Sequence, residues 1–334
     1  MNGLLIGLLG TLVAMNQASA ASNVIQQSTS IPVSISNSNN LAETELDELM
    51  AADDAAQAEV SKWIRDNNAF AAQGAGESKE ALNRRIMARL NVVRKGYEDF
   101  LRRYPDSASG HVAYGSFLND IGEEEAAMRH NEKASQLDPK NPAAWNNLAN
   151  YYCENGLLTN AFTDYAKAIE LNPIEPVYYE NFATVVYLYR KDAREFYHIN
   201  EQQVFDKSLA LYRKAMQLDP ENFRLATDYA DSYYEIRPLR TNEMLAAWSN
   251  ALQIAHNDIE REGVYIHLAR TKMLAGRFAE ARAQLDAVTN ANYSDLKHTL
   301  ERAITWRENK ATNASAVNTS TNVTAPTNSS PKAE

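Results

Sequence analysis

The sequence predicts an all-α protein, built as a right-handed superhelical solenoid of antiparallel helix pairs. The first observation is an internal repeat, because residues 108–141 and 142–175 are each 34 residues long and align without a gap. A period of this length is typical of arrays in which each repeat is one helical hairpin. The second observation is the placement of proline, which cannot continue a helix and stops it where it occurs. Six of the ten prolines lie at the boundaries that this repeat requires: Pro105, Pro139, Pro142, Pro173, Pro176 and Pro220.

Residues 142–175 show how one repeat is expected to fold. The first half carries an apolar stripe with the i, i+3, i+4, i+7 spacing of a helix, formed by Trp145, Leu148, Ala149 and Tyr152. The second half carries a similar stripe, formed by Ala161, Tyr165 and Ala168. Gly156 lies between the halves, where the first helix ends and the chain reverses. We expect Ala149 and Ala161 to allow close helix crossing, and the rings of Trp145 and Tyr165 to meet across the hairpin.

These positions resemble the tetratricopeptide repeat family. The residues that match in the best repeat are Trp145, Leu148, Ala149, Tyr152, Gly156, Ala161, Tyr165, Ala168 and Pro173. The resemblance covers roughly residues 78–308, with an insertion near 188–206 that either lengthens both helices or forms a protruding loop, and a capping helix at 293–308. It implies a non-enzymatic scaffold that binds a protein or peptide.

The two ends of the chain are not expected to belong to this fold. Residues 3–15 form an apolar run of 13, too short to span a membrane, and small residues follow at Ala18-Ser19-Ala20. We predict a signal peptide at 1–20 and export after cleavage near Ala20, with a buried helix or an uncleaved anchor as alternatives. Residues 21–42 are interpreted as a flexible linker and 309–334 as a disordered tail rich in Asn, Thr and Ser. Whether the four N-x-S/T sequons of that tail are glycosylated is left open.

Charge divides the region before the first complete repeat. The acidic segment 43–77, predicted to be helical, has seven acids and no base within 43–59, whereas 84–103 carries seven bases and two acids. One hypothesis is that the acidic helix folds back on the basic helix and caps the solenoid; the alternative is that both are ordinary solvated faces. The basic helix is not expected to bind nucleic acid, because it lacks interleaved aromatic residues and the chain has a formal net charge of −10.

No catalytic, metal or cofactor motif stands out, so we predict that the protein is not an enzyme and has no cofactor. A single cysteine excludes an internal disulfide. Cys153 lies on the predicted first helix of the best repeat, and the sequence nominates no histidine partner for it, so we interpret it as structural. The six histidines are scattered without paired ligand spacing.

The remaining candidate is a surface. In a stack of helix pairs the first helices line the concave face, and their polar stripe predicts a peptide-binding groove made by Asn146, Asn147, Asn150, Asn181, Thr184, Asp228, Asp231, His267 and Arg270. Asn147 and Asn181 are 34 residues apart, so they should stack in register. An asparagine amide can both donate to and accept from a peptide group; the alternative is that these asparagines are solvated and hold no ligand. Rival functions are an assembly factor acting through its convex face or by oligomerisation, and an accessory subunit of an envelope enzyme.

Overall fold

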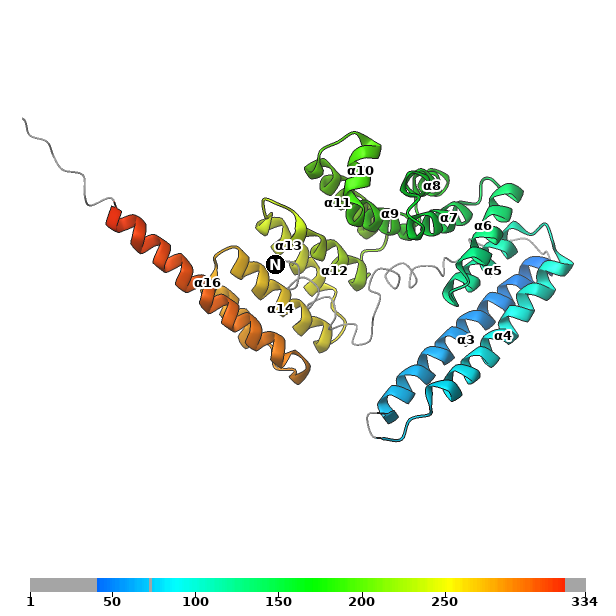
Figure 1. Ribbon diagram of the computed structural model, residues 1–334, viewed down its shortest axis with the longest axis horizontal. Helices are drawn as coiled ribbons and strands as arrows, with labels where there is room; N and C mark the ends of the chain where they lie inside the picture. Colours follow the sequence, from blue (N-terminus) through cyan, green and yellow to red (C-terminus); the bar gives the residue numbers. More distant parts are fainter. Residues whose placement is uncertain (1–40, 72–73, 322–334) are drawn as a thin grey trace, which may run out of the picture. The chain divides into compact units, whose positions relative to one another are not determined.

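The computed structural model describes residues 41–71 and 74–321 (Figure 1). In these ranges the chain forms fourteen α-helices and two short 3-10 helices, and no strand occurs, so the predicted all-α class is confirmed. The helices belong to two compact units, whose boundary falls between Leu211 and Tyr212. The predicted signal peptide at 1–20, most of the predicted linker at 21–42 and the end of the predicted tail lie outside the described residues.

Unit 1 is a series of antiparallel helix pairs (Figure 1). Its helices are α3 (Leu41–Ala71), α4 (Lys79–Arg103), α5 (Ala108–Asp120), α6 (Glu124–Leu137), α7 (Pro142–Glu154), α8 (Leu158–Leu171), α9 (Pro176–Leu188), α10 (Arg190–Tyr197) and the first part of α11 (Glu201–Leu218). α5 pairs with α6 and α7 with α8, as the 34-residue repeat predicts.

The turn within each of these pairs depends on a glycine in the left-handed backbone region. Gly122 has φ of 81° and Gly156 has φ of 72°, values that residues with a Cβ rarely adopt. Beyond the turn the helices approach closely, because the side chains at Ala149, Ala161 and Ala168 are small. All three residues are completely buried as a result. The small-residue contacts expected from the sequence are therefore present.

The large rings of the best repeat are arranged differently from the expectation. Trp145 packs in the cluster that contains Ala144 and Ala168. Tyr165 lies in a neighbouring cluster, and its ring stacks on Phe182 of α9 with 5.5 Å between centroids. Trp145 lies in the first turn of α7, whereas Tyr165 lies near the middle of α8, where its hydroxyl contacts Asn150, so the two rings do not meet.

The acidic helix α3 folds back on the basic helix α4, as one of the two hypotheses proposed. Ion pairs join Glu59 to Arg89 at 2.8 Å and Glu45 to Arg103. The Tyr97 hydroxyl also donates to Asp53 at 3.0 Å. Ion pairs this exposed contribute little, so the apolar seam does most to stabilise the hairpin. Its buried members are Leu46, Ala56 and Val60 of α3 with Leu90, Val93, Tyr97 and Phe100 of α4.

The insertion after α9 is a separate short helix followed by a lengthened one. α10 packs the rings of Phe196 and Tyr197 against Phe162 of α8, with centroids 5.3 and 5.8 Å apart. Lys207 of α11 places its ammonium 4.2 Å from the centroid of Tyr197, a cation–π contact. The insertion is therefore docked on the repeat and forms neither the protruding loop nor the two lengthened helices that were the stated alternatives.

Unit 2 continues the helix pairs. Its further elements are α12 (Phe223–Asp231), η1 (Ser232–Glu235), α13 (Thr241–Gln253), α14 (Asp258–Leu274), α15 (Phe278–Asp286), η2 (Ala291–Tyr293) and α16 (Ser294–Thr321). Leu300 and Ile304 of α16 are buried, as expected of a capping helix. α16 continues past residue 308 into the segment predicted to be disordered, because neither glycine nor proline interrupts the chain between Gly276 and Pro326.

Candidate functional site

The asparagines predicted to line a groove lie on α7 and α9 of unit 1 and are buried. Asn146, Asn147, Asn150 and Asn181 are between 0% and 7% exposed. Thr184 is half-buried on α9, three residues after Asn181. Buried amides are costly unless they are hydrogen-bonded, so their partners decide what each of them can do.

Three of these asparagines form a continuous chain of hydrogen bonds, which we call the asparagine chain. Asn181 donates to Asn146 Oδ1 at 3.1 Å, and Asn146 donates to Asn147 Oδ1 at 3.3 Å. Asn147 in turn donates to Asn131 Oδ1 at 3.3 Å and to Ser116 Oγ at 3.1 Å. The chain therefore links α9, α7, α6 and α5. The partner of Asn181 is Asn146, one residue before the Asn147 that the 34-residue spacing suggested.

Asn131 belongs to this chain, and sequence reasoning missed it. Its own amide donates to Ala127 O at 3.0 Å within α6. A Cβ added to Gly115 would lie 2.8 Å from Asn131 Nδ2, so the glycine leaves the space that the amide occupies. The available signal was that Gly115 aligns with Ala149 of the next repeat: the smaller residue indicates a bulkier neighbour at that position.

Asn150 is held differently. Its Oδ1 accepts a hydrogen bond of 2.6 Å from the Tyr165 hydroxyl, which comes from the core on α8. Its Nδ2 is buried and has no hydrogen-bond partner. Because Tyr165 occupies Oδ1, Nδ2 is the end of the amide that remains to donate. Leaving such a donor unsatisfied costs about 1–3 kcal/mol.

Asn150 lines a small hollow between α5, α6 and α7, which we call the Asn150 hollow. Its volume is about 10 Å³, the size of one water molecule. Its polar lining residues are Ser116, Asn119, Glu124, Asn131, Asn147, Asn150 and Tyr151. The hollow can therefore receive a single acceptor atom, such as a carbonyl oxygen, next to an unsatisfied donor.

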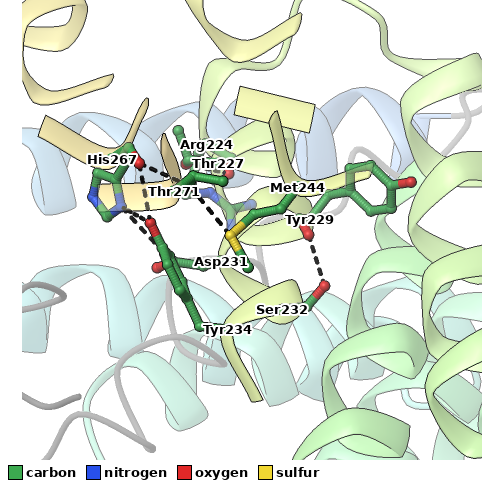
Figure 2. Close-up of polar contacts among 9 residues, drawn as sticks. All are labelled: Arg224, Thr227, Tyr229, Asp231, Ser232, Tyr234, Met244, His267 and Thr271. Carbon is green, nitrogen blue, oxygen red and sulfur yellow. Dashed lines mark hydrogen bonds and ion pairs between the residues drawn. The ribbon is translucent and has the colours of Figure 1, made fainter. Parts of the chain in front are cut away.

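The other predicted site residues, Asp228, Asp231, His267 and Arg270, lie in unit 2, and Figure 2 draws Asp231 and His267 among them. Asp228 forms an ion pair of 3.2 Å with Arg224 along α12. Asp231, at the end of the same helix, places its Oδ1 3.7 Å from His267 Nδ1 of α14. Figure 2 shows the Tyr234 hydroxyl beside the same imidazole, 3.3 Å from Nδ1. The structure thus brings Asp231 and His267 together, 36 residues apart in the sequence.

Aromatic packing fixes this second cluster. The imidazole of His267 stacks on Trp248 with 4.0 Å between centroids. Arg270 lies over the ring of Tyr234, 4.3 Å from its centroid. Burial, with a smaller effect of the Arg270 charge, lowers the pKa of His267 to about 3. Burial raises the pKa of Asp231 to about 6, and Arg270 opposes that rise. At neutral pH the imidazole is therefore uncharged and makes a polar contact with Asp231 instead of an ion pair.

The described residues offer little for catalysis. Burial raises the pKa of the Cys153 thiol to about 11, so its nucleophilic thiolate is scarce at neutral pH. Within residues 41–71 and 74–321 no three side chains of His, Cys, Asp or Glu gather as a metal site would need. The same part of the chain contains no helix with the length and apolarity required to cross a membrane.

Comparisons with known proteins agree with this helical repeat architecture. Residues 130–162 match a family model described as tetratricopeptide repeat. Over 99 residues the chain is 29% identical to Hsp70-Hsp90 organizing protein 2 of Arabidopsis thaliana. That match covers 30% of this chain, which spans only 15% of the length of that relative.

Two solved structures are similar in fold. One is YrrB, described as a TPR protein with an unusual peptide-binding site: it is 14% identical, the match covers 62% of this chain and 97% of that one, and the TM-score is 0.47. The other is pilF of Pseudomonas aeruginosa, with 16% identity, coverage of 73% and 99%, and a TM-score of 0.45.

The matched family model and the glycine-turned helix pairs define the class of protein. The chain contains a tetratricopeptide repeat at residues 130–162, within a series of helix pairs of the same kind. Repeats of this family are typically non-catalytic modules for protein interaction.

We predict that replacing Gly115 by Ala destabilises the protein, although alanine is the better helix former by about 1 kcal/mol. The added Cβ would displace the Asn131 amide and leave Asn147 without one of its acceptors. Urea unfolding followed by circular dichroism should show a loss of about 1–3 kcal/mol. In a double-mutant cycle with Asn131→Ala the two losses should not add, because the second change removes the obstructed amide. A gain in stability for Gly115→Ala would contradict the arrangement.

We also predict an acid-sensitive contribution from His267. Its pKa is about 3 when folded and near the ordinary histidine value of 6.5 when unfolded, so between these values the unfolded chain binds the extra proton. Stability from this group is complete above pH 6.5 and is lost as the pH falls toward 3. Asp231 acts in the opposite direction between about pH 6 and 3.8.

The test is urea unfolding at pH 7 and pH 5. His267→Phe keeps a ring against Trp248, and it should lose about 1–2 kcal/mol less than the wild type on acidification. An unchanged pH dependence in His267→Phe would show that the imidazole is not held neutral.

Proposed function

We propose that the protein is a non-enzymatic scaffold that binds a peptide or protein segment along the inner helices of unit 1, with the Asn150 hollow as the anchoring position. The observation that carries this proposal is the buried, unsatisfied Nδ2 of Asn150. A backbone carbonyl oxygen of an extended segment is small enough to enter the hollow and can accept a hydrogen bond from Asn150 Nδ2.

The geometry around Asn150 favours a ligand over simple structural use. Three neighbouring asparagines satisfy one another, and a core hydroxyl fixes the orientation of the fourth. These hydrogen bonds hold the asparagine side chains in place before a ligand arrives. Binding at Asn150 Nδ2 would therefore cost little conformational entropy, which favours affinity. The similarity to Hsp70-Hsp90 organizing protein 2 supports a scaffolding role. The groove assignment of Thr184, Asp228, Asp231, His267 and Arg270 stays a prediction.

We further propose that the protein is exported. The support is the apolar run of residues 3–15 followed by Ala18-Ser19-Ala20, the order of features in a cleavable signal peptide. Export would place the scaffold among partners outside the cytoplasm.

The groove proposal predicts that Asn150→Asp weakens capture of the partner at least tenfold. The variant keeps an oxygen to accept from Tyr165 but replaces the donor with an atom that repels a carbonyl. The measurement is quantitative mass spectrometry of proteins retained from envelope extract. Asn160→Asp introduces the same charge at an exposed position of α8 and should retain the wild-type set. Equal capture by both variants would remove the hollow from the binding site.

The export proposal predicts that the protein isolated from its source begins near Ala21. N-terminal sequencing checks this directly. Leu8→Arg interrupts the apolar run and should leave the uncleaved chain in the cytoplasm, whereas Gln27→Arg lies beyond the expected cleavage position and should not. A mature chain that still begins at Met1 would contradict the proposal.

A further inference from the structure

One carboxylate lines the Asn150 hollow, and a second lies one helical turn further along α7. Glu124, in the first turn of α6, is one of its lining residues. Glu154 follows Asn150 by four residues on α7, and residues four apart lie on the same face of a helix. A segment that reaches the hollow along α7 would therefore pass Glu154 within one helical turn.

Neither carboxylate has a cationic partner in the described part of the chain. Glu124 and Glu154 make no hydrogen bond or ion pair there. Arg94 is bound by both carboxylate oxygens of Glu123, the residue before Glu124. Burial, and to a smaller degree the negative charge of Glu124, raise the pKa of Glu154 to about 7. The two side chains therefore repel each other electrostatically, and the protein supplies nothing to compensate.

We propose that the segment bound at the Asn150 hollow is basic, with an arginine side chain that pairs with Glu124 and Glu154 while a neighbouring carbonyl oxygen accepts from Asn150 Nδ2. This inference rests on the proposed function and names the chemistry of the partner. A guanidinium has five donors in a planar fork, so it can contact two carboxylates at once. It relieves their repulsion, whereas an acidic segment would increase it. The formal net charge of −10 also favours association with a basic partner.

The buried donor makes this more than an acidic patch. Asn150 is 3% exposed, and its Nδ2 requires an acceptor from outside the chain. A donor that lacks an acceptor and a carboxylate that lacks a cation thus lie within one turn of α7. A peptide satisfies both, because every residue offers a carbonyl and an arginine adds the charge.

The test uses capped nonapeptides of Ser, Gly and Ala with arginine, citrulline or glutamate at the centre. Citrulline has nearly the shape of arginine without its charge, so it isolates the ion pair. Binding is followed by NMR through the side-chain amide signals of Asn150 in the full chain at low salt. The arginine peptide should bind at least fivefold more tightly than the citrulline peptide and should lower the pKa of Glu154, followed through its carboxyl ¹³C shift. The glutamate peptide should bind least.

The double variant Glu124→Gln, Glu154→Gln should abolish the preference for arginine and keep citrulline binding. Glu125→Gln, at an exposed neighbour on α6 outside the hollow, should keep the preference. If the arginine and citrulline peptides bind equally, the inference is overturned and the proposed function stands. If the glutamate peptide binds best, the inference is likewise overturned. If no peptide moves the Asn150 amide, both proposals fail.

Discussion

The close crossing of two helices at residues without large side chains is the contact on which each repeat depends. At Ala149 and Ala161 the helices of a pair meet with no exposed surface left on either residue. A pair of this size cannot bury its whole apolar surface alone, so the next pair must cover it. The left-handed glycine turns at Gly122 and Gly156 make the reversal short enough for that contact to form.

Close packing also decides what happens to polar residues on the inner helices. α7 is in contact with α5, α6, α8 and α9, so its asparagines are buried whether or not they bind a ligand. Burial obliges Asn146 and Asn147 to find partners, and the asparagine chain is the result. Such a fully satisfied network can fix the register between successive pairs, because a shift of one residue would leave amides unpaired. Among these asparagines, Asn150 is the one with a buried donor, Nδ2, that has no hydrogen-bond partner, so it remains available to a ligand.

The sequence was sufficient to predict what repeats. The helix pairs, the turn at Gly156 and the small-residue contacts follow from spacing, because glycine or alanine recurs at the same positions of residues 108–141 and 142–175. The polar contacts could not be predicted in the same way. Asn181 bonds Asn146 instead of Asn147, since the crossing of α7 and α9 determines which amides face each other and spacing alone does not. Asn131 lies on the second helix of its pair, outside the stripe considered. Asp231 and His267 were both identified from the stripe, but the contact of Tyr234 with the imidazole depends on the break of the first helix into η1, which the spacing does not predict.

The distribution of charge separates structural from functional polarity in this protein. Several arginines of the α3–α4 hairpin face an acid of the same hairpin, as Arg89 faces Glu59, and such exposed pairs contribute little energy. The amides of the asparagine chain are uncharged and hydrogen-bond one another, so they shape the surface without attracting a charged ligand of either sign. Glu124 and Glu154 are different, because their charges adjoin an unsatisfied donor and no cation of the described chain offsets them. The uncompensated charges of Glu124 and Glu154 lower the stability of the free protein, as does the unsatisfied Nδ2 of Asn150. A partner that supplies a cation and an acceptor would recover this free energy on binding.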